Sequence, residues 1–476
     1  MEFEQDLLAR QEARVLAREA EQAQKTLVTL GAEGLDKICR AVATEFEKKA
    51  LELAELAVRE TGFGNVEDKI TKNIFASHRV WEAIRDMKTL GVLNRDDGEK
   101  LWKIGVPVGV VAAIVPSTNP TSTVCYKALI ALKAGCSIVF SPHPKAISCT
   151  RRAVEVVARA AENAGAPKGS VSCLTIPSLD GCRELMGAPE TRLILATGGP
   201  AMVKAAYSSG KPAIGVGAGN GPAYIHKSAD VAGALKKILR SKTFDNGTVC
   251  ASEQSIIIEK AMVSKVKSMA VGLGFYFLTP EDAEALSKVL FRPNGALNPQ
   301  VVGKTALQLA QLCGFSVPKT TKILVAREYG VGVKHPYSME KLCPVLGLYV
   351  EENEAGVLSR SLEILHHEGR GHTFSLHTED VSVVERFARS MPVSRFLVNT
   401  PAALGGIGAS TNLFPALTLG CGAVGGSATS NNVSPMDLIN IRMVAWDSGK
   451  DEKKEPMDTL VEVITAKILE KLNKGY

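Results

Sequence analysis

Cys250 is the residue of this chain whose surroundings best suit covalent chemistry. Small residues, Gly247, Ala251 and Ser252, stand on both sides of it, and the apolar stretch 255–258 follows. A thiolate is a strong nucleophile at neutral pH once the pKa of the thiol is lowered, and small neighbours leave room for a substrate carbonyl. A cysteine ahead of an apolar strand is more commonly part of a core. The wider sequence has to decide between these two interpretations.

Strands alternating with helices are predicted on both sides of Cys250. Strand-like apolar segments are separated by stretches with helical spacing, and a second series of this kind begins near residue 223, after a glycine-rich stretch. This alternation predicts βαβ units and mainly parallel sheets, arranged in two α/β lobes. Three helices are expected to precede the first lobe, at 3–25, 31–49 and 50–60. The strand-like segments lie at 104–115, 137–140, 171–176, 193–196 and 255–259.

Length, charge and cysteine content exclude several classes of protein. A chain of 476 residues exceeds one ordinary domain, and a hydrophobic content of 45% is ample for a large core. A net charge of +6 without a long basic block argues against nucleic acid. Ten cysteines without a CxxC pair argue against a metal site or a disulfide framework and favour the reducing cytoplasm. The charged residues 1–25 do not resemble a signal peptide, and no apolar run predicts a membrane span.

The segment around Cys250 resembles the nucleophile loop of the aldehyde dehydrogenase superfamily, in particular of its CoA-acylating branch. Several further segments match in the same order, and the resemblance covers residues 25–446. It implies two doubly wound parallel-sheet lobes and a small β extension, formed by residues 88–106 and 426–446, that pairs subunits into homodimers or homotetramers. The matching segments are 116–121, 141–144, 196–200, 215–220, 244–254, 340–345, 371–373 and 419–422.

The same resemblance divides the chain into four parts. Residues 1–225 are expected to bind the nucleotide, and 226–425 to form the catalytic domain that carries Cys250. Residues 426–446 belong to the oligomerisation extension with 88–106, and 447–476 form a linker and an amphipathic helix. Cys343 and Cys421 are rival thiols, but neither lies in the matching nucleophile segment.

The resemblance assigns catalytic roles to three residues. Cys250 would attack the aldehyde, while the Asn119 side-chain amide and the backbone N–H of Cys250 would stabilise the oxyanion. Hydrolytic relatives read Pro-Trp-Asn, whereas this chain places the asparagine one residue later, so that Thr118 could compete for the role. His372 would take the proton of the CoA thiol or shape the acyl pocket.

The resemblance also implies a nicotinamide cofactor, with NAD favoured over NADP. Thr197, Gly198 and Gly199 follow a predicted strand and open a predicted helix, where backbone N–H groups suit a phosphate. Glu340 would bind the ribose of the nicotinamide. A GxGxxG pattern at 420–425 lacks the following helix of a dinucleotide site and is set aside. The other residues assigned to the cofactor are Thr118, His143, Pro144, Gly217 and Gly219.

The absence of a carboxylate in the stretch 215–220 favours coenzyme A as the acyl acceptor. Hydrolytic relatives carry there a glutamate that activates water, and such a base contributes about 10²–10⁴-fold to the rate. Without it, a thiol is the natural acceptor of the acyl group. A short aldehyde, propionaldehyde or acetaldehyde, is the expected substrate. Three alternatives stay open: the same chemistry on succinate semialdehyde or sulfoacetaldehyde, a hydrolytic enzyme, and an inactive cargo or assembly protein with this fold.

The C-terminal segment differs in kind from the rest of the chain. A polar linker, 447–455, precedes Pro456 and a stretch with one apolar stripe, which predicts a helix. Such a short helix is marginal alone in water and needs a partner surface. It could pack on its own domain or oligomer, or residues 456–474 could bind a shell protein, since the arrangement resembles the encapsulation peptides of bacterial microcompartment enzymes. The stripe consists of Met457, Leu460, Val461, Ile464, Ile468 and Leu472.

Overall fold

The first lobe is built on a five-stranded parallel sheet. The computed structural model describes residues 4–176, 178–448 and 457–474. The strand order is β5-β4-β3-β6-β7, so the chain moves outward from β3 in one direction and then returns to β6 on its other side. This reversal makes a topological switch point between β3 and β6, where open α/β sheets bind their ligands. The strands are β3 (Val110–Ile114), β4 (Ser137–Ser141), β5 (Val171–Cys173), β6 (Thr191–Thr197) and β7 (Ala213–Val216).

Helices cover both faces of this sheet. Side chains of α2 (Gly31–Lys48), α6 (Pro120–Lys133) and α7 (Ile147–Asn163) form a core with one face. Helix α1 (Gln5–Leu27) lies on the other face with α8 (Leu179–Gly187) and α9 (Pro200–Tyr207), and it packs closely because all of its buried residues except Leu27 are alanines. The helices α3 (Ala50–Thr61), α4 (Val66–Ile74) and α5 (Val80–Ile84) complete this lobe.

The second lobe contains a seven-stranded parallel sheet in the order β10-β11-β12-β9-β8-β13-β14. Its two faces are covered by separate apolar cores, one with α10 and α11 and the other with α14 and α15. The two-lobed α/β fold predicted from the alternating pattern is therefore confirmed. The strands are β8 (Gly221–Ile225), β9 (Glu253–Glu259), β10 (Phe275–Phe277), β11 (Ile323–Arg327), β12 (Val345–Glu351), β13 (Gly371–His377) and β14 (Val393–Val398). The helices are α10 (Val231–Thr243), α11 (Val263–Gly272), α12 (Pro280–Leu290), α13 (Ala306–Leu312), α14 (Glu354–His367), α15 (Val381–Ser390) and α16 (Ala402–Gly406).

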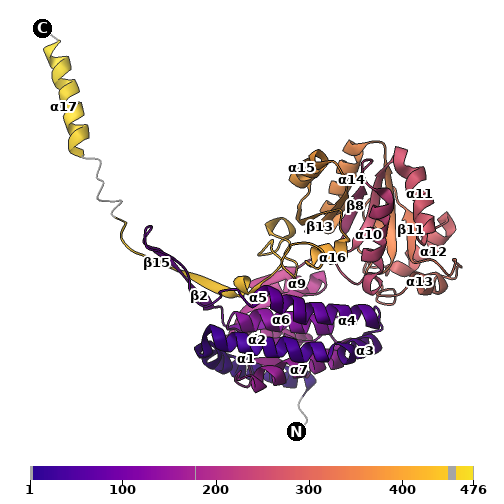
Figure 1. Ribbon diagram of the computed structural model, residues 1–476, viewed down its shortest axis with the longest axis horizontal. Helices are drawn as coiled ribbons and strands as arrows, with labels where there is room; N and C mark the ends of the chain where they lie inside the picture. The colour runs from indigo at the N-terminus through magenta and orange to yellow at the C-terminus, as the bar shows by residue number, and fades with distance from the viewer. Residues whose placement is uncertain (1–3, 177, 449–456, 475–476) are drawn as a thin grey trace.

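A three-stranded antiparallel sheet projects from the two lobes (Figure 1). It consists of β1 (Gly91–Asp96), β2 (Leu101–Pro107) and β15 (Ile439–Ala445). The expectation of one strand over 104–115 is wrong, because the chain ends β2 at Pro107 and begins β3 at Val110. Gly109 between them has φ +123°, a conformation that only glycine adopts easily, and this turn sends the two strands to different sheets.

The predicted C-terminal helix is present as α17 (Met457–Asn473). The side chains that the structure describes in it, from Leu460 onward, are exposed, and Figure 1 shows the helix well away from both lobes. Residues 449–456, most of the predicted linker together with Pro456, lie outside the described residues. None of the described helices has both the length and the apolar character required to cross a bilayer.

Candidate active site

A cavity of about 240 Å³ lies between the two lobes. The loops after β3 (116–119) and β6 (197–199) line it from the first lobe, and Cys250 and Glu340 line it from the second. A neighbouring pocket of about 500 Å³ shares Pro116, His143 and the 197–199 loop with it and extends along α8 and α9. The switch point of the first sheet therefore opens directly onto the candidate nucleophile.

The loop that carries Cys250 has an unusual backbone. Asp245, Asn246 and Gly247 all have positive φ, at +48°, +51° and +79°. Aspartate, asparagine and glycine are the residues that tolerate this region best. The loop delivers Cys250 to the cavity just before β9 begins at Glu253.

The electrostatics around Cys250 differ from those expected of a nucleophile with a lowered pKa. Burial, and after it the nearby Glu340 carboxylate, raise the pKa of the Cys250 thiol to about 12, while Arg395 opposes the shift. Cys250 is half-buried at the edge of the cavity, and the surrounding protein removes part of the hydration of a thiolate. With this pKa, the thiol form of Cys250 is favoured at neutral pH in the structure without ligands.

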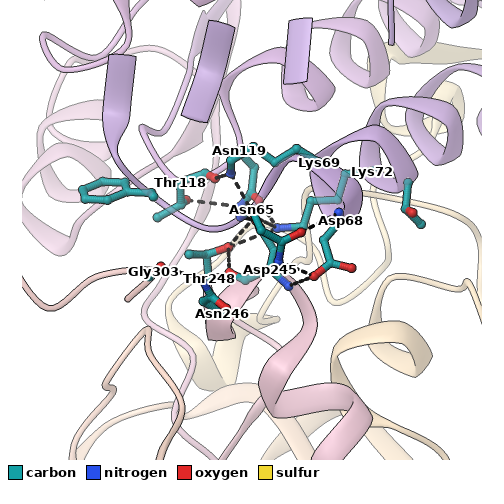
Figure 2. Close-up of polar contacts among 12 residues, drawn as sticks. Asn65, Asp68, Lys69, Lys72, Thr118, Asn119, Asp245, Asn246, Thr248 and Gly303 are labelled. Atoms are coloured by element: carbon teal, nitrogen blue, oxygen red, sulfur yellow. Dashed lines mark hydrogen bonds and ion pairs between the residues drawn. The ribbon is translucent and has the colours of Figure 1, made fainter. Parts of the chain in front are cut away.

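A buried cluster of charges joins the nucleophile loop to the first lobe (Figure 2). The Asp245 carboxylate is fully buried and its Oδ2 accepts hydrogen bonds from Lys69 Nζ at 2.9 Å and Lys72 Nζ at 2.5 Å. Both lysines come from α4. Burial alone would raise the pKa of Asp245, but the two ammonium groups lower it. Asp68 Oδ2 accepts a hydrogen bond from the Asp245 backbone N–H at 2.7 Å, and the loop is thus tied to α4 by side chain and backbone.

Lys72 also contacts the loop that carries Asn119 (Figure 2). Its Nζ donates to Asn119 Oδ1 at 2.6 Å and to Thr248 Oγ1 at 3.1 Å. Asn119 Nδ2 donates to Thr118 Oγ1 at 3.1 Å. One ammonium group therefore links the predicted oxyanion donor to the nucleophile loop, and both Thr118 and Asn119 line the cavity as the sequence predicts for a ligand site.

Two glycines allow close approach around the nucleophile loop. A Cβ on Gly64, whose φ is +72°, would lie 1.7 Å from Asp245 Oδ1. A Cβ on Gly219 would lie 1.9 Å from the carbonyl oxygen of Cys250. Gly219, which the sequence predicts to bind the cofactor, is absent from the described lining of both cavities and packs instead against the nucleophile loop.

Glu340 is the only carboxylate among the described residues that line the cavity beside Cys250. Its Oε1 accepts a hydrogen bond from Gly219 N–H at 3.0 Å, and its own backbone N–H donates to Glu368 Oε2 at 2.7 Å. Burial, and then the charge of Glu368, raise the pKa of Glu340 to about 8. An enclosed carboxyl group of this kind suits hydrogen bonding to neutral hydroxyls.

The loop before α9 fits the phosphate and ribose groups of a nucleotide. Thr197 lines both cavities, and its Oγ1 is buried without a hydrogen-bond partner among the described atoms. A Cβ added to Gly199 would meet no heavy atom within 4 Å, so the space beside the loop is open. A polar ligand would satisfy Thr197 and meet the N–H groups that open α9.

Of the remaining residues predicted to form the site, three line one or both cavities and one is absent from their described lining. His143 lines both cavities, Pro144 only the larger one, and Gly217 only the smaller one. His372 lies at the start of β13 with no exposed surface, and its Nδ1 pairs with Thr373 Oγ1 at 2.8 Å. Burial lowers the pKa of His372 to about 3. His372 is absent from the described lining of the cavity beside Cys250, and the structure offers no support for its predicted part in taking a proton.

No role for Lys69, Lys72, Asp245 or Thr248 was predicted from the sequence. Lysine side chains on an amphipathic helix are usually exposed, whereas both of these are 3% exposed. The sequence signal available was their spacing of three, which places them on one face of α4. The acceptor that buries them comes from a distant part of the chain.

The fold and cavity define a two-lobed α/β protein with a cysteine facing a nucleotide-type pocket, and comparisons with known proteins agree. The aldehyde dehydrogenase family matches residues 5–272. The chain is 44% identical over 439 residues to the bifunctional aldehyde-alcohol dehydrogenase AdhE of Escherichia coli (strain K12), covering 91% of this chain and 49% of that protein. This chain thus spans about half the length of that curated relative.

Solved structures match over nearly their whole length. A probable aldehyde dehydrogenase from Listeria monocytogenes EGD-e has 51% identity and a TM-score of 0.92, over 94% of this chain and 98% of that one. An acetylating aldehyde dehydrogenase from Geobacillus thermoglucosidasius has 47% identity and a TM-score of 0.91, over 93% and 98%. The chain therefore belongs to the aldehyde dehydrogenase family, in its CoA-acylating branch.

Proposed function

We propose that this protein is a CoA-acylating aldehyde dehydrogenase, which converts an aldehyde, CoA and NAD⁺ to an acyl-CoA, NADH and a proton. The observation that carries the proposal is the cavity that brings Cys250 and Asn119 together with Glu340 as its only carboxylate among the described lining residues. That carboxylate accepts from the Gly219 N–H, and the stretch 215–220 supplies no other base. A thioester formed on Cys250 would lack an activated water and would pass to a thiol.

The reaction begins with attack of Cys250 Sγ on the carbonyl carbon of the aldehyde. The Asn119 Nδ2 donor and the Cys250 backbone N–H are the groups proposed to meet the oxyanion that forms. A bound nicotinamide would supply the hydride acceptor and a positive charge that favours the thiolate. Oxidation leaves the acyl group on Cys250 as a thioester, and attack by the CoA thiol releases acyl-CoA and restores Cys250.

The cofactor proposal rests on the two adjoining cavities. Thr197, Gly198 and Gly199 border both of them, so a nucleotide could place its phosphates there and direct its nicotinamide end toward Cys250. Glu340 would accept from ribose hydroxyls, and His143 with Pro144 would lie near the adenosine end. NAD is proposed over NADP.

A short uncharged aldehyde, acetaldehyde or propionaldehyde, is the proposed substrate. Lys72 is the one lysine or arginine among the described residues that line the cavity beside Cys250, and each of its three N–H groups has an acceptor within the protein. It therefore offers no donor to a substrate anion.

Anionic aldehydes form the second candidate. The chain is 36% identical to a sulfoacetaldehyde dehydrogenase of Acholeplasma sp and 34% identical to the acetylating succinate-semialdehyde dehydrogenase of Clostridium kluyveri. The substrates in those names are those of the two relatives, and they make an anionic aldehyde the second candidate for this protein.

An NADH absorbance assay with acetaldehyde, propionaldehyde, succinate semialdehyde and sulfoacetaldehyde tests the function. NADH production should depend on CoA and be fastest with the uncharged aldehydes. Steady production of free carboxylic acid at a rate indifferent to CoA would instead support a hydrolytic enzyme with Glu340 as its base. No NADH with any aldehyde would support an inactive cargo or assembly protein.

The projecting sheet and α17 are proposed to serve assembly. Ile441, Met443 and Trp446 expose apolar surface at the end of the three-stranded sheet, which suits pairing with a second copy. The exposed apolar stripe of α17 suits a shell protein of a bacterial microcompartment in the cytoplasm. A similar solved structure, 28% identical, is a propionaldehyde dehydrogenase from the Clostridium phytofermentans fucose utilisation bacterial microcompartment.

Deleting residues 449–476 separates the two roles of these surfaces. The shortened protein should keep its turnover and its oligomeric state, measured by light scattering, and lose binding to a shell protein. Loss of the oligomer would show that α17 packs between subunits instead.

A further inference from the structure

We propose that Lys72 is a positioning residue that fixes the side-chain amide of Asn119 beside Cys250, an inference that rests on the function proposed above. Lys72 Nζ lies 2.6 Å from Asn119 Oδ1 and 3.1 Å from Thr248 Oγ1. Asn119 belongs to the loop after β3, and Thr248 precedes Cys250 by two residues. A single ammonium therefore sets the oxyanion donor and the nucleophile loop relative to each other.

The chemistry of an ammonium group determines which way the amide faces. Lysine can only donate, so the atom of Asn119 that meets it has to be the oxygen. Asn119 Nδ2 then lies on the other side, where one of its N–H bonds points to Thr118 Oγ1 at 3.1 Å. The second N–H is left for a ligand, and Asn119 borders the cavity beside Cys250. An amide rotated by half a turn would present its oxygen there and repel an oxyanion.

The ammonium is itself held in one place. Asp245 Oδ2 accepts from Lys72 at 2.5 Å and from Lys69 at 2.9 Å, and Thr248 Oγ1 donates to the same oxygen at 2.7 Å. All three N–H groups of Lys72 have acceptors, and its side chain is 3% exposed. Preorganised donors of this kind need not reorganise as charge develops, which is how they lower a barrier.

Lys69 provides a matched control within the same cluster. It has the same type, burial and Asp245 acceptor, but it contacts the backbone oxygen of Thr118 rather than the Asn119 amide. Replacing either lysine by methionine keeps the side-chain length and leaves Asp245 with one cationic partner. Lys72→Met and Lys69→Met thus each remove one positive charge. Only Lys72→Met also removes the hydrogen bond to the side-chain amide of Asn119.

The test is a double-mutant cycle on CoA-dependent turnover. Asn119→Ala should lower kcat by about 10²–10³-fold, as expected for loss of an oxyanion donor. Lys72→Met should lower kcat with little change in the KM for NAD⁺ or CoA. The double variant should be no slower than Asn119→Ala, because Lys72 acts through the residue already removed. By contrast, any loss of kcat in Lys69→Met should multiply with the loss in Asn119→Ala when the two substitutions are combined.

Alkylation of Cys250 by iodoacetamide supplies a readout that forms no oxyanion. Its rate, followed by mass spectrometry of the Cys250 peptide, should be the same in Lys72→Met and in the unsubstituted protein. A slower rate would mean that Lys72 acts on the thiol and would overturn the inference. If the losses of kcat in Lys72→Met and Asn119→Ala multiply in the double variant, the two residues act independently and the inference is wrong. The proposed function would still stand, because the unsubstituted enzyme is active.

A second variant covers the case in which Lys72→Met does not fold. Lys72→Gln keeps a polar side chain, but its amide can present either a donor or an acceptor to Asn119. It should show the same loss of kcat and the same lack of a further effect with Asn119→Ala. Unchanged kcat in Lys72→Gln would contradict the proposal.

Discussion

The two lobes deliver their residues to the shared cavity in different ways. The first lobe uses the loops that follow β3 and β6 at the carboxyl ends of a parallel sheet, on both sides of its switch point. The second lobe presents Cys250 from the loop that precedes β9, at the amino end of that strand. Sheet topology alone therefore explains where the nucleotide-type pocket lies, but it does not explain where the thiol lies.

The contacts that hold the 197–199 loop and the nucleophile loop in place also differ. The 197–199 loop is positioned by its strand and helix, and its Thr197 hydroxyl has no hydrogen-bond partner within the described part of the chain. The nucleophile loop bends through three consecutive residues with positive φ and is held by Asp245, whose lysine partners lie in the other lobe. We infer that the thiol site depends on contact between the lobes, whereas the nucleotide pocket depends chiefly on one sheet.

The largest effect is expected from the thiol itself. Cys250→Ser should lower CoA-dependent NADH production by at least about 10⁴-fold, because a hydroxyl is a far weaker nucleophile than a thiolate. Binding of NAD⁺, measured by calorimetry, should be retained since the nucleotide pocket lies mainly on the first lobe. Substantial residual turnover would remove Cys250 from its proposed role.

The contacts of Asp245 between the lobes can be disturbed without substituting a charged residue. Gly64→Ala would place a Cβ 1.7 Å from Asp245 Oδ1, so the carboxylate has to move and the nucleophile loop with it. Turnover should fall by about 10²-fold, the scale on which small displacements act.

Gly62→Ala is the control for Gly64→Ala. Gly62 has a similar φ of +68°, but the nearest atom to an added Cβ is Lys304 Nζ at 3.9 Å. It should cost about 1–2 kcal/mol in the free energy of unfolding, from backbone strain alone, and leave turnover nearly intact. Equal turnover in the two variants would show that the Asp245 contact does not position the thiol.

The protonation of Cys250 gives the third test. Because burial raises the pKa of this thiol to about 12, its thiolate fraction should increase about tenfold for each pH unit. In the protein without ligands, the rate of Cys250 alkylation should keep rising from about pH 8 to about pH 10. A rate that levels off below about pH 9 would reveal an ordinary or lowered pKa.

The smallest effect is expected in the nucleotide pocket. Thr197→Val removes a buried hydroxyl that has no partner among the described atoms, so the free energy of unfolding should not fall, while NAD⁺ affinity should drop about 3–10-fold. Thr191→Val on the same strand is the matched control. It breaks the bond from Thr191 Oγ1 to the Leu185 carbonyl at 2.7 Å and should lower stability without changing NAD⁺ affinity. Unchanged affinity in Thr197→Val would separate Thr197 from the nucleotide.

Much of the fold could be predicted from hydrophobic spacing. The three N-terminal helices, the strand–helix alternation and α17 all appear close to the residues expected, because each depends on local pattern. The stretch 104–115 was harder, since its residues are uniformly apolar in character. Only the turn at Gly109 shows that β2 and β3 belong to different sheets.

The candidate site was predictable where a residue's neighbours in sequence are also its neighbours in space. Cys250, Asn119, Glu340 and the 197–199 loop do line one cavity. His372 and Gly219 were placed by the same reasoning, yet both pack into the protein interior beside it.

By itself the sequence determined the alternation of strands and helices, the loop of small residues around Cys250 and the lack of a carboxylate in 215–220, because these are properties of adjacent residues. Only the tertiary structure decided that Lys69 and Lys72 would be buried against Asp245 and that the pKa of the Cys250 thiol would be raised. The physical reason is that desolvation and charge pairing depend on which distant segments exclude water together.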